Sequence, residues 1–151
     1  MIFNRRTEIV DFIVERLKQI DKQVSPYDTE YTFVTNLFNN VYRELKFIDE
    51  VNDFPSLYLS AGTEIRNFQS KNLTEALLTV IIRAYVHGED NSQSLADELI
   101  QDVEHVIYNI GDEPEKGIFD ITIENITADE GLVTPYGIAE IELTVNYRLE
   151  D

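Results

Sequence analysis

The first apolar pattern in the chain has the period of an α-helix. Over residues 4–20 the apolar positions fall within one arc when successive residues are placed about 100° apart. Asn4 suits the N-cap, because its side chain accepts a hydrogen bond from a free backbone N–H. The arc consists of Ile9, Val10, Ile13, Val14, Leu17 and Ile20. Phe12 falls outside it, so we expect an amphipathic helix that leaves this ring exposed, as in a subunit contact.

A second and longer helical pattern runs over residues 92–110. Its apolar stripe, widened by further apolar residues, is formed by Leu95, Leu99, Val103, Val106 and Ile110. The far side of this helix carries Asp97, Glu98, Asp102 and Glu104, which we expect to face water. Gly111 follows directly and is placed to end the helix in the left-handed conformation.

Strand patterns occupy much of the remaining chain. Apolar and polar residues alternate over residues 119–124 and again over 139–148, which predicts strands with one face on a core and one face in water. Residues 56–60 indicate a strand that ends at Gly62. Residues 73–87 form a long pattern that is apolar on both faces at its middle, typical of a central strand covered on both sides.

These elements predict one α+β domain spanning residues 1–151. We expect a mostly antiparallel sheet with the two amphipathic helices packed on one face. Residues 21–53 show no clear period, although Ser25-Pro26 must interrupt the first helix, because proline disfavours helix in the residue before it. Their structure stays open at this point.

The most informative feature of the composition is its charge. The chain of 151 residues has 12 Lys and Arg against 29 Asp and Glu, a net charge of −17, which opposes binding to nucleic acid phosphates. It contains no cysteine, which excludes disulfides and thiolate chemistry. We find no apolar run of membrane-spanning length and no signal peptide, so we expect a protein made in the cytoplasm that does not act in a membrane.

The negative charge is concentrated in the second part of the chain. Residues 1–48 hold seven basic and seven acidic side chains, whereas residues 49–151 hold five basic and 22 acidic ones. Two interpretations are open: a solvated face, or a surface that meets a basic partner or avoids adhering to DNA.

Candidate catalytic chemistry is sparse. The six glycines form no phosphate-binding loop, and no Gly-x-Ser-x-Gly motif occurs. His87 and His105 read as ordinary surface histidines. The carboxylates of Asp49, Glu50 and Asp53 are of the type that holds Mg²⁺, but such clusters arise by chance in so acidic a chain. We therefore expect no catalytic, cofactor-binding or metal-binding residues.

The order of elements resembles a known family. A Phe54-Pro55-Ser56-Leu57-Tyr58 strand with Gly62 and Glu64 just after it is followed by the long strand, the acidic helix and a last alternating strand ending at Tyr147. This order is similar to that of the tail terminator, or tail completion, proteins of long-tailed bacteriophages. The resemblance implies a hexameric ring that caps the tail tube at the head-proximal end of the virion tail and offers its other side to the head connector. It also implies a lumen that passes DNA without specific binding, and no catalytic step.

For a protein in this role, we propose candidate residues for two surfaces. We expect subunit contacts at Phe12, Phe54, Tyr58 and Tyr147. We expect the lumen or acidic surface to include Glu140, Glu142, Asp97, Glu98 and Asp102. The wet-faced strand over residues 137–149 is the first candidate for a subunit edge. The alternatives are a neck connector or head-closure protein, a small acidic cytoplasmic adaptor that binds a basic partner, and a small acid-rich enzyme.

Overall fold

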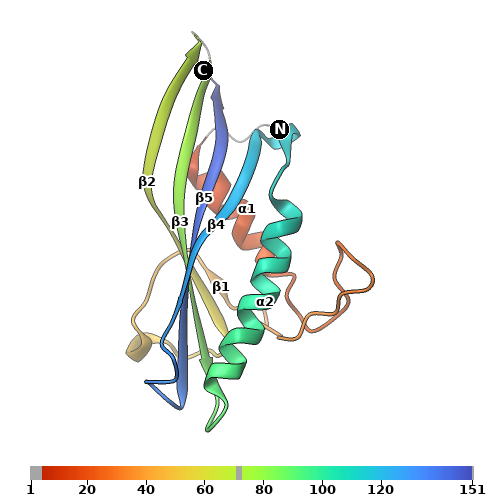
Figure 1. Ribbon diagram of the computed structural model, residues 1–151, viewed down its shortest axis with the longest axis vertical. Helices are drawn as coiled ribbons and strands as arrows, with labels where there is room; N and C mark the ends of the chain where they lie inside the picture. Colours follow the sequence, from red (N-terminus) through yellow and green to blue (C-terminus); the bar gives the residue numbers. More distant parts are fainter. Residues whose placement is uncertain (1–4, 71–72, 151) are drawn as a thin grey trace.

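The structure is a computed structural model that describes residues 5–70 and 73–150 (Figure 1). Asn4, the expected N-cap, lies outside the described residues. The elements are α1 (Arg6–Leu17), β1 (Val41–Tyr42), η1 (Ile48–Glu50), β2 (Ser56–Ser70), β3 (Leu73–His87), α2 (Ser92–Ile110), η2 (Pro114–Lys116), β4 (Ile118–Ala128) and β5 (Tyr136–Glu150). In this part of the chain, no helix is both long and apolar enough to cross a membrane.

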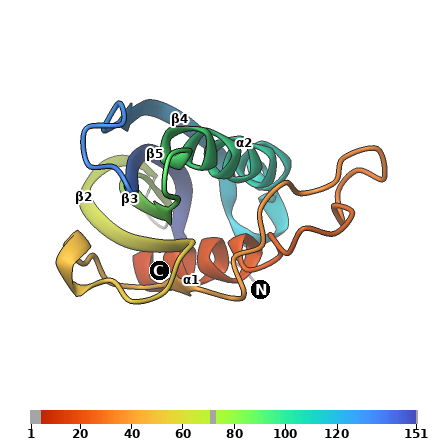
Figure 2. The ribbon, with the colours of Figure 1, turned by 90° about the horizontal axis from the view of Figure 1, so that it is seen from below.

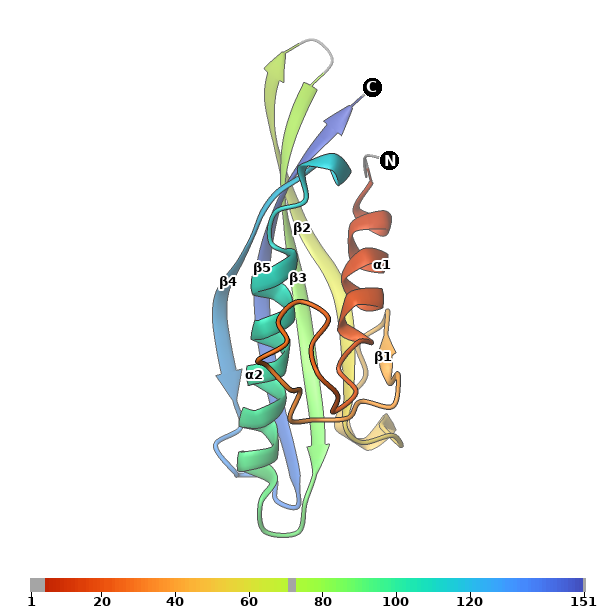
Figure 3. The ribbon, with the colours of Figure 1, turned by 90° about the vertical axis from the view of Figure 1, so that its right-hand side faces the viewer.

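The strands form one sheet in the order β1-β2-β3-β5-β4. Only the short β1–β2 pair is parallel, so the prediction of an α+β fold with a mostly antiparallel sheet is confirmed. β2 does not end at Gly62: a register shift between Ala61 and Glu64 lets the strand continue to Ser70. The resulting β2–β3 hairpin reaches beyond both helices (Figure 3).

Both helices pack on the same face of the sheet, as the alternation predicted. Leu59, Ile82 and Ile141 are paired across three strands and are fully buried on this face. Figure 2, a view along the strands, shows the sheet curving around α1 and α2. β3 occupies the centre, but Ile81 is only half-buried on the opposite face, so the expectation that this strand is covered on both sides is wrong there.

Phe12 is buried in the core and is not an exposed contact residue as predicted. Only 8% of it is accessible to solvent. The guanidinium of Arg16 lies 4.6 Å from its ring centroid, and the Lys116 ammonium lies over the same ring at 5.9 Å. The η2 segment thus covers a flank of α1 that the helical period alone leaves open to water.

The ends of the helices differ from prediction in two places. α1 ends at Leu17 rather than Ile20, although Ile20 remains buried in the core. α2 spans the predicted residues 92–110, but Gly111 has a φ of −66° and is right-handed. A left-handed glycine follows η2 instead: Gly117, with a φ of 84°, lies where the chain turns into β4.

The segment over residues 21–40 is held in place by a buried carboxylate. Asp102 is fully buried, so its predicted place on an acidic surface is wrong. Its Oδ1 accepts hydrogen bonds from the Tyr31 hydroxyl at 2.7 Å and the Val34 N–H at 3.1 Å. Its Oδ2 accepts one from the Thr35 N–H at 2.8 Å. The carboxylate therefore replaces the backbone partners that this irregular segment lacks.

The two histidines occupy different environments. His105 is half-buried, stacks on the Tyr31 ring with centroids 3.8 Å apart, and hydrogen-bonds to the Ser25 hydroxyl at 2.7 Å. His105 therefore helps Asp102 to hold the 21–40 segment against α2, and it is not an ordinary surface histidine. His87 is exposed at the end of β3, as expected, with its ring 5.1 Å from that of Tyr136.

Candidate functional site on the outer face of the sheet

We call the face of the sheet turned away from α1 and α2 the outer face. Alternation along β5 places Glu140 and Glu142 on it, because the neighbouring Ile141 points into the core. The register with β3 sets Glu140 opposite Arg83 and Glu142 opposite Ile81. All four side chains are half-buried, so this face is a partly screened, charged surface.

Arg83 and Glu140 form an ion pair at the middle of the outer face. The guanidinium Nη2 lies 2.8 Å from the carboxylate Oε1, and their side chains are 26% and 41% exposed. The hydrogen bond to Glu140 is the main cause that raises the pKa of Arg83, against the opposing effect of burial. Glu140 is therefore partly neutralised, and Glu142 is the carboxylate that contributes the less compensated charge here.

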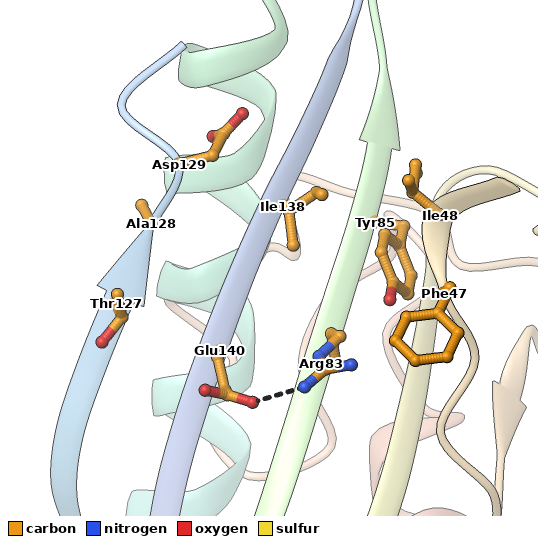
Figure 4. A pocket seen from close by; sticks show the side chains of 9 residues that line it. All are labelled: Phe47, Ile48, Arg83, Tyr85, Thr127, Ala128, Asp129, Ile138 and Glu140. Carbon is orange, nitrogen blue, oxygen red and sulfur yellow. Dashed lines mark hydrogen bonds and ion pairs between the residues drawn. The ribbon is translucent and has the colours of Figure 1, made fainter. Parts of the chain in front are cut away.

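A hollow of about 400 Å³ opens beside this ion pair (Figure 4). Its lining includes the apolar side chains of Phe47, Tyr85 and Ile138 together with Arg83 and Glu140. Phe47 is 71% exposed at its position in the segment before η1. Apolar surface bordered by charged groups is the arrangement found in protein–protein contacts.

Asp129 also lines this hollow. Among the described residues, neither of its buried carboxylate oxygens has a hydrogen-bond partner. A buried carboxylate without a hydrogen-bond donor is energetically costly. Sequence reasoning did not find this hollow, because it depends on how residues near 47, 83 and 129 meet across the sheet.

The residues predicted as subunit contacts are mostly internal. Tyr58 is 2% exposed and Tyr147 is fully buried, which corrects the expectation that these rings meet another subunit. Tyr58 packs against Tyr85 in a small cluster on the outer face, with ring centroids 5.7 Å apart. Phe54 is half-buried, 5.6 Å from the ring of Tyr136, and remains partly accessible.

Tyr147 instead joins two strands that are not neighbours in the sheet. Its hydroxyl donates a hydrogen bond to the Glu64 carboxylate. Burial, followed by this bond, raises the pKa of Tyr147. Burial alone would raise the pKa of Glu64, but hydrogen bonds from Tyr147 and Arg66 lower it overall. The pair therefore fastens β5 to β2 across β3.

The predicted acidic residues do not form one surface. Glu140 and Glu142 lie on the outer face of the sheet, whereas Asp97 and Glu98 lie on α2, which covers the other face. Asp97 is exposed and Glu98 is half-buried. In a single subunit these two pairs are therefore separated by the sheet.

Fold and surface define a small α+β protein whose sheet is covered by helices on one face and carries charged side chains and a hollow on the other. A family model described as Bacteriophage Tail Tube Terminator Protein matches residues 3–151. The tail tube terminator protein p142 of Escherichia phage T5 is 30% identical over 156 residues, covering 96% of this chain and 94% of that protein. The chain belongs to the bacteriophage tail tube terminator family, as the order of elements suggested.

Among solved structures, a chain from the virion of a native gene transfer agent particle is similar. It has a TM-score of 0.49 and 12% identity, covering 72% of this chain and 78% of that one. The family and the curated relative are structural phage proteins. The protein is accordingly a structural component of a phage tail, which favours this prediction over the adaptor and enzyme alternatives.

Proposed function

We propose that six copies of this protein form a ring that closes the tail tube at its head-proximal end. One side of the ring contacts the tail tube protein and the other contacts the head connector or neck protein. DNA passes through the lumen without specific binding. The observation that carries this proposal is the family match over residues 3–151, together with a relative that aligns along nearly its whole length.

The charge of the chain supports a lumen that DNA crosses freely. A net charge of −17 opposes contact with phosphate. Repulsion acts within a Debye length of about 8 Å at physiological salt, so only carboxylates that line the passage affect passing DNA. Glu142, with its neighbour Glu140 on the outer face, is the group we assign to the wall.

The shape of the subunit supports a ring. A closed ring needs one surface of each subunit to meet a different surface of the next. The sheet has two different edges, β4 on one side and β1 with β2 on the other. Contacts between unlike edges would leave one broad face of every subunit directed at the hole.

Imaging tests this function directly. Purified protein, alone and mixed with isolated tail tubes, is examined by mass photometry and negative-stain electron microscopy. We expect six-subunit rings and tubes capped at one end. A monomer at every concentration, with tubes left uncapped, would refute the proposal. Rings that bind head connectors but never tubes would assign the chain to the neck instead.

A further inference from the structure

The two parts of the chain differ strongly in charge, and α2 and β4 of the acidic part lie together on one side of the molecule. Residues 84–147, which include α2, β4 and most of β5, contain 15 acidic side chains and one lysine. Residues 1–83, which include α1, β1 and β2, contain 12 acidic and ten basic side chains. Seen along the strands, α2 and β4 lie along one side of the molecule and α1 along the other (Figure 2). The acidic residues of α2 and β4 therefore lie on one side of the molecule, whereas Glu140 and Glu142 lie on β5 within the sheet.

A groove of about 880 Å³ runs between α2 and β4 on the acidic side. Its lining includes three carboxylates and two exposed aromatic rings: Glu104, Asp112, Asp120, Tyr108 and Phe119. Tyr108 is 88% exposed and Phe119 is 44% exposed. Large exposed aromatic side chains surrounded by charged ones are typical of the energetic centre of a protein contact.

The groove borders an edge of the sheet. In the strand order, β4 is the last strand and pairs with β5 alone among the described strands. An edge strand offers backbone donors and acceptors to another chain. Charged side chains, aromatic rings and an open backbone edge therefore converge on one side of the subunit.

We propose that this groove binds the α1–β2 side of a second copy of the same chain, an inference that rests on the proposed ring. The occupant is argued from charge. Arg5 and Arg43 are exposed on the α1 side, Arg43 in an ion pair with Asp11 at the surface of the helix. These guanidinium groups approach Glu104 and Asp120 of the neighbouring copy, with Tyr108 as the apolar anchor.

Charge also decides the symmetry of the contact. A two-fold contact would set one acidic groove against another, and like charges brought together oppose association. A contact between the acidic groove of one copy and the arginine-bearing side of the next is head-to-tail, the type of contact from which closed rings are built. It leaves the outer face of the sheet free to line the lumen.

Substitution of Tyr108 tests whether this side chain contributes to the contact between copies. Tyr108→Ala removes a ring that is 88% exposed, so the stability of the monomer should change little. We expect it to raise the concentration of half-assembly by roughly tenfold or more, as hot-spot aromatic residues do. Leu132→Ala is the matched control, because Leu132 is 84% exposed but lies in the turn before β5, outside the groove. It should assemble like the wild-type chain.

Charge reversal tests which surfaces meet. The groove variant carries Glu104→Lys and Asp120→Lys, and the partner-side variant carries Arg5→Glu and Arg43→Glu. Each variant alone should fail to form rings at concentrations at which the wild type does. An equimolar mixture should restore rings in which the two variants strictly alternate, which native mass spectrometry detects with a mass-labelled variant. Glu30→Lys, an exposed reversal in the 21–40 segment, is the control.

The outcomes separate this contact from the proposed function. Wild-type rings with no loss in Tyr108→Ala or the reversed variants would overturn the contact and leave the ring standing. Variants that fail alone and also fail when mixed, although circular dichroism shows them folded, would overturn the head-to-tail pairing of these two surfaces. A wild-type chain that never assembles, alone or on tail tubes, would overturn both the contact and the proposed function.

Discussion

The buried carboxylate of Asp102 offers the sharpest test of how this fold is held together. We predict that Asp102→Ala detaches the 21–40 segment from α2, because it removes the acceptor of three hydrogen bonds at once. The Val34 and Thr35 N–H groups would then lack a protein partner. The helical period places Asp102 on a polar helix face, from which almost no loss of stability is expected for Asp102→Ala. The period and the structure therefore lead to different predictions for this substitution.

The magnitude follows from the contacts. Hydrogen bonds to a charged group contribute about 1.5–3 kcal/mol each, and breaking a buried charged network costs about 3–5 kcal/mol in all. We therefore expect Asp102→Ala to lower the free energy of unfolding by about 4 kcal/mol. Asp102→Asn keeps one acceptor oxygen but sets an amide N–H₂ against the Thr35 N–H, so a loss of about 2 kcal/mol is expected.

Urea unfolding followed by far-UV circular dichroism measures these losses. The control is Asp97→Ala, an exposed carboxylate in the same helix, which should change the free energy of unfolding by less than about 0.5 kcal/mol. A double-mutant cycle between Tyr31→Phe and Asp102→Asn then isolates the bond between the hydroxyl and the carboxylate. Equal losses for Asp102→Ala and Asp97→Ala would refute the reasoning.

An alkaline pH series gives an independent readout of the same contact. Burial, with the added effect of the hydrogen bond to Asp102, raises the pKa of Tyr31 to about 12. The unfolded chain releases this proton at its ordinary pKa near 10, so the contribution is fully present below about pH 10 and is lost as pH rises towards 12. Tyr31→Phe should therefore flatten the loss of stability in this range.

Three further predictions follow from the placement of single side chains. Phe12→Ala should lower the free energy of unfolding of the monomer by about 3 kcal/mol in a urea titration, because the ring is a core residue; weakened assembly with unchanged monomer stability would contradict this. Tyr147→Phe should remove one of the two hydrogen-bond donors that lower the pKa of Glu64, so the stability gained as pH rises through the acidic range should shrink; an unchanged acid-unfolding curve would argue against the pair. Glu142→Lys should reduce phage infectivity more than Glu142→Gln when the two variants assemble equally many particles. Glu142 is chosen because reversal of Glu140 would also break its ion pair with Arg83. Equal infectivity of the two Glu142 variants would remove this residue from the lumen wall.

Local pattern was sufficient for the regular elements. α2 spans the predicted residues, and β3 and β5 cover the segments whose apolar positions indicated strands. Because a helix or strand repeats its environment at a fixed period, the spacing of apolar residues indicates the type of element and its main buried face. The family resemblance likewise rested on the order of these elements, and the family match confirms it.

The irregular segment and the contact surfaces needed long-range information. Residues 21–53 show no hydrophobic period. Some of their backbone N–H groups, such as those of Val34 and Thr35, donate hydrogen bonds to Asp102, which lies far away in the sequence. The hollow on the outer face and the groove beside β4 are each lined by residues from several elements. The residues that line each of these two sites lie in segments that are far apart in the chain, so no short stretch of sequence reveals them.

The class of fold, the two helices, the long strands and the charge of the second half of the chain can all be predicted from the amino-acid sequence. Each of these properties depends on neighbouring residues or on a sum over residues, so none of them requires knowledge of the packing. The burial of Phe12, Tyr147 and Asp102, and the division of the acidic residues between two faces of the sheet, became evident from the folded chain. Burial depends on what covers a residue from elsewhere in the chain: η2 for Phe12, the 21–40 segment for Asp102 and β2 for Tyr147.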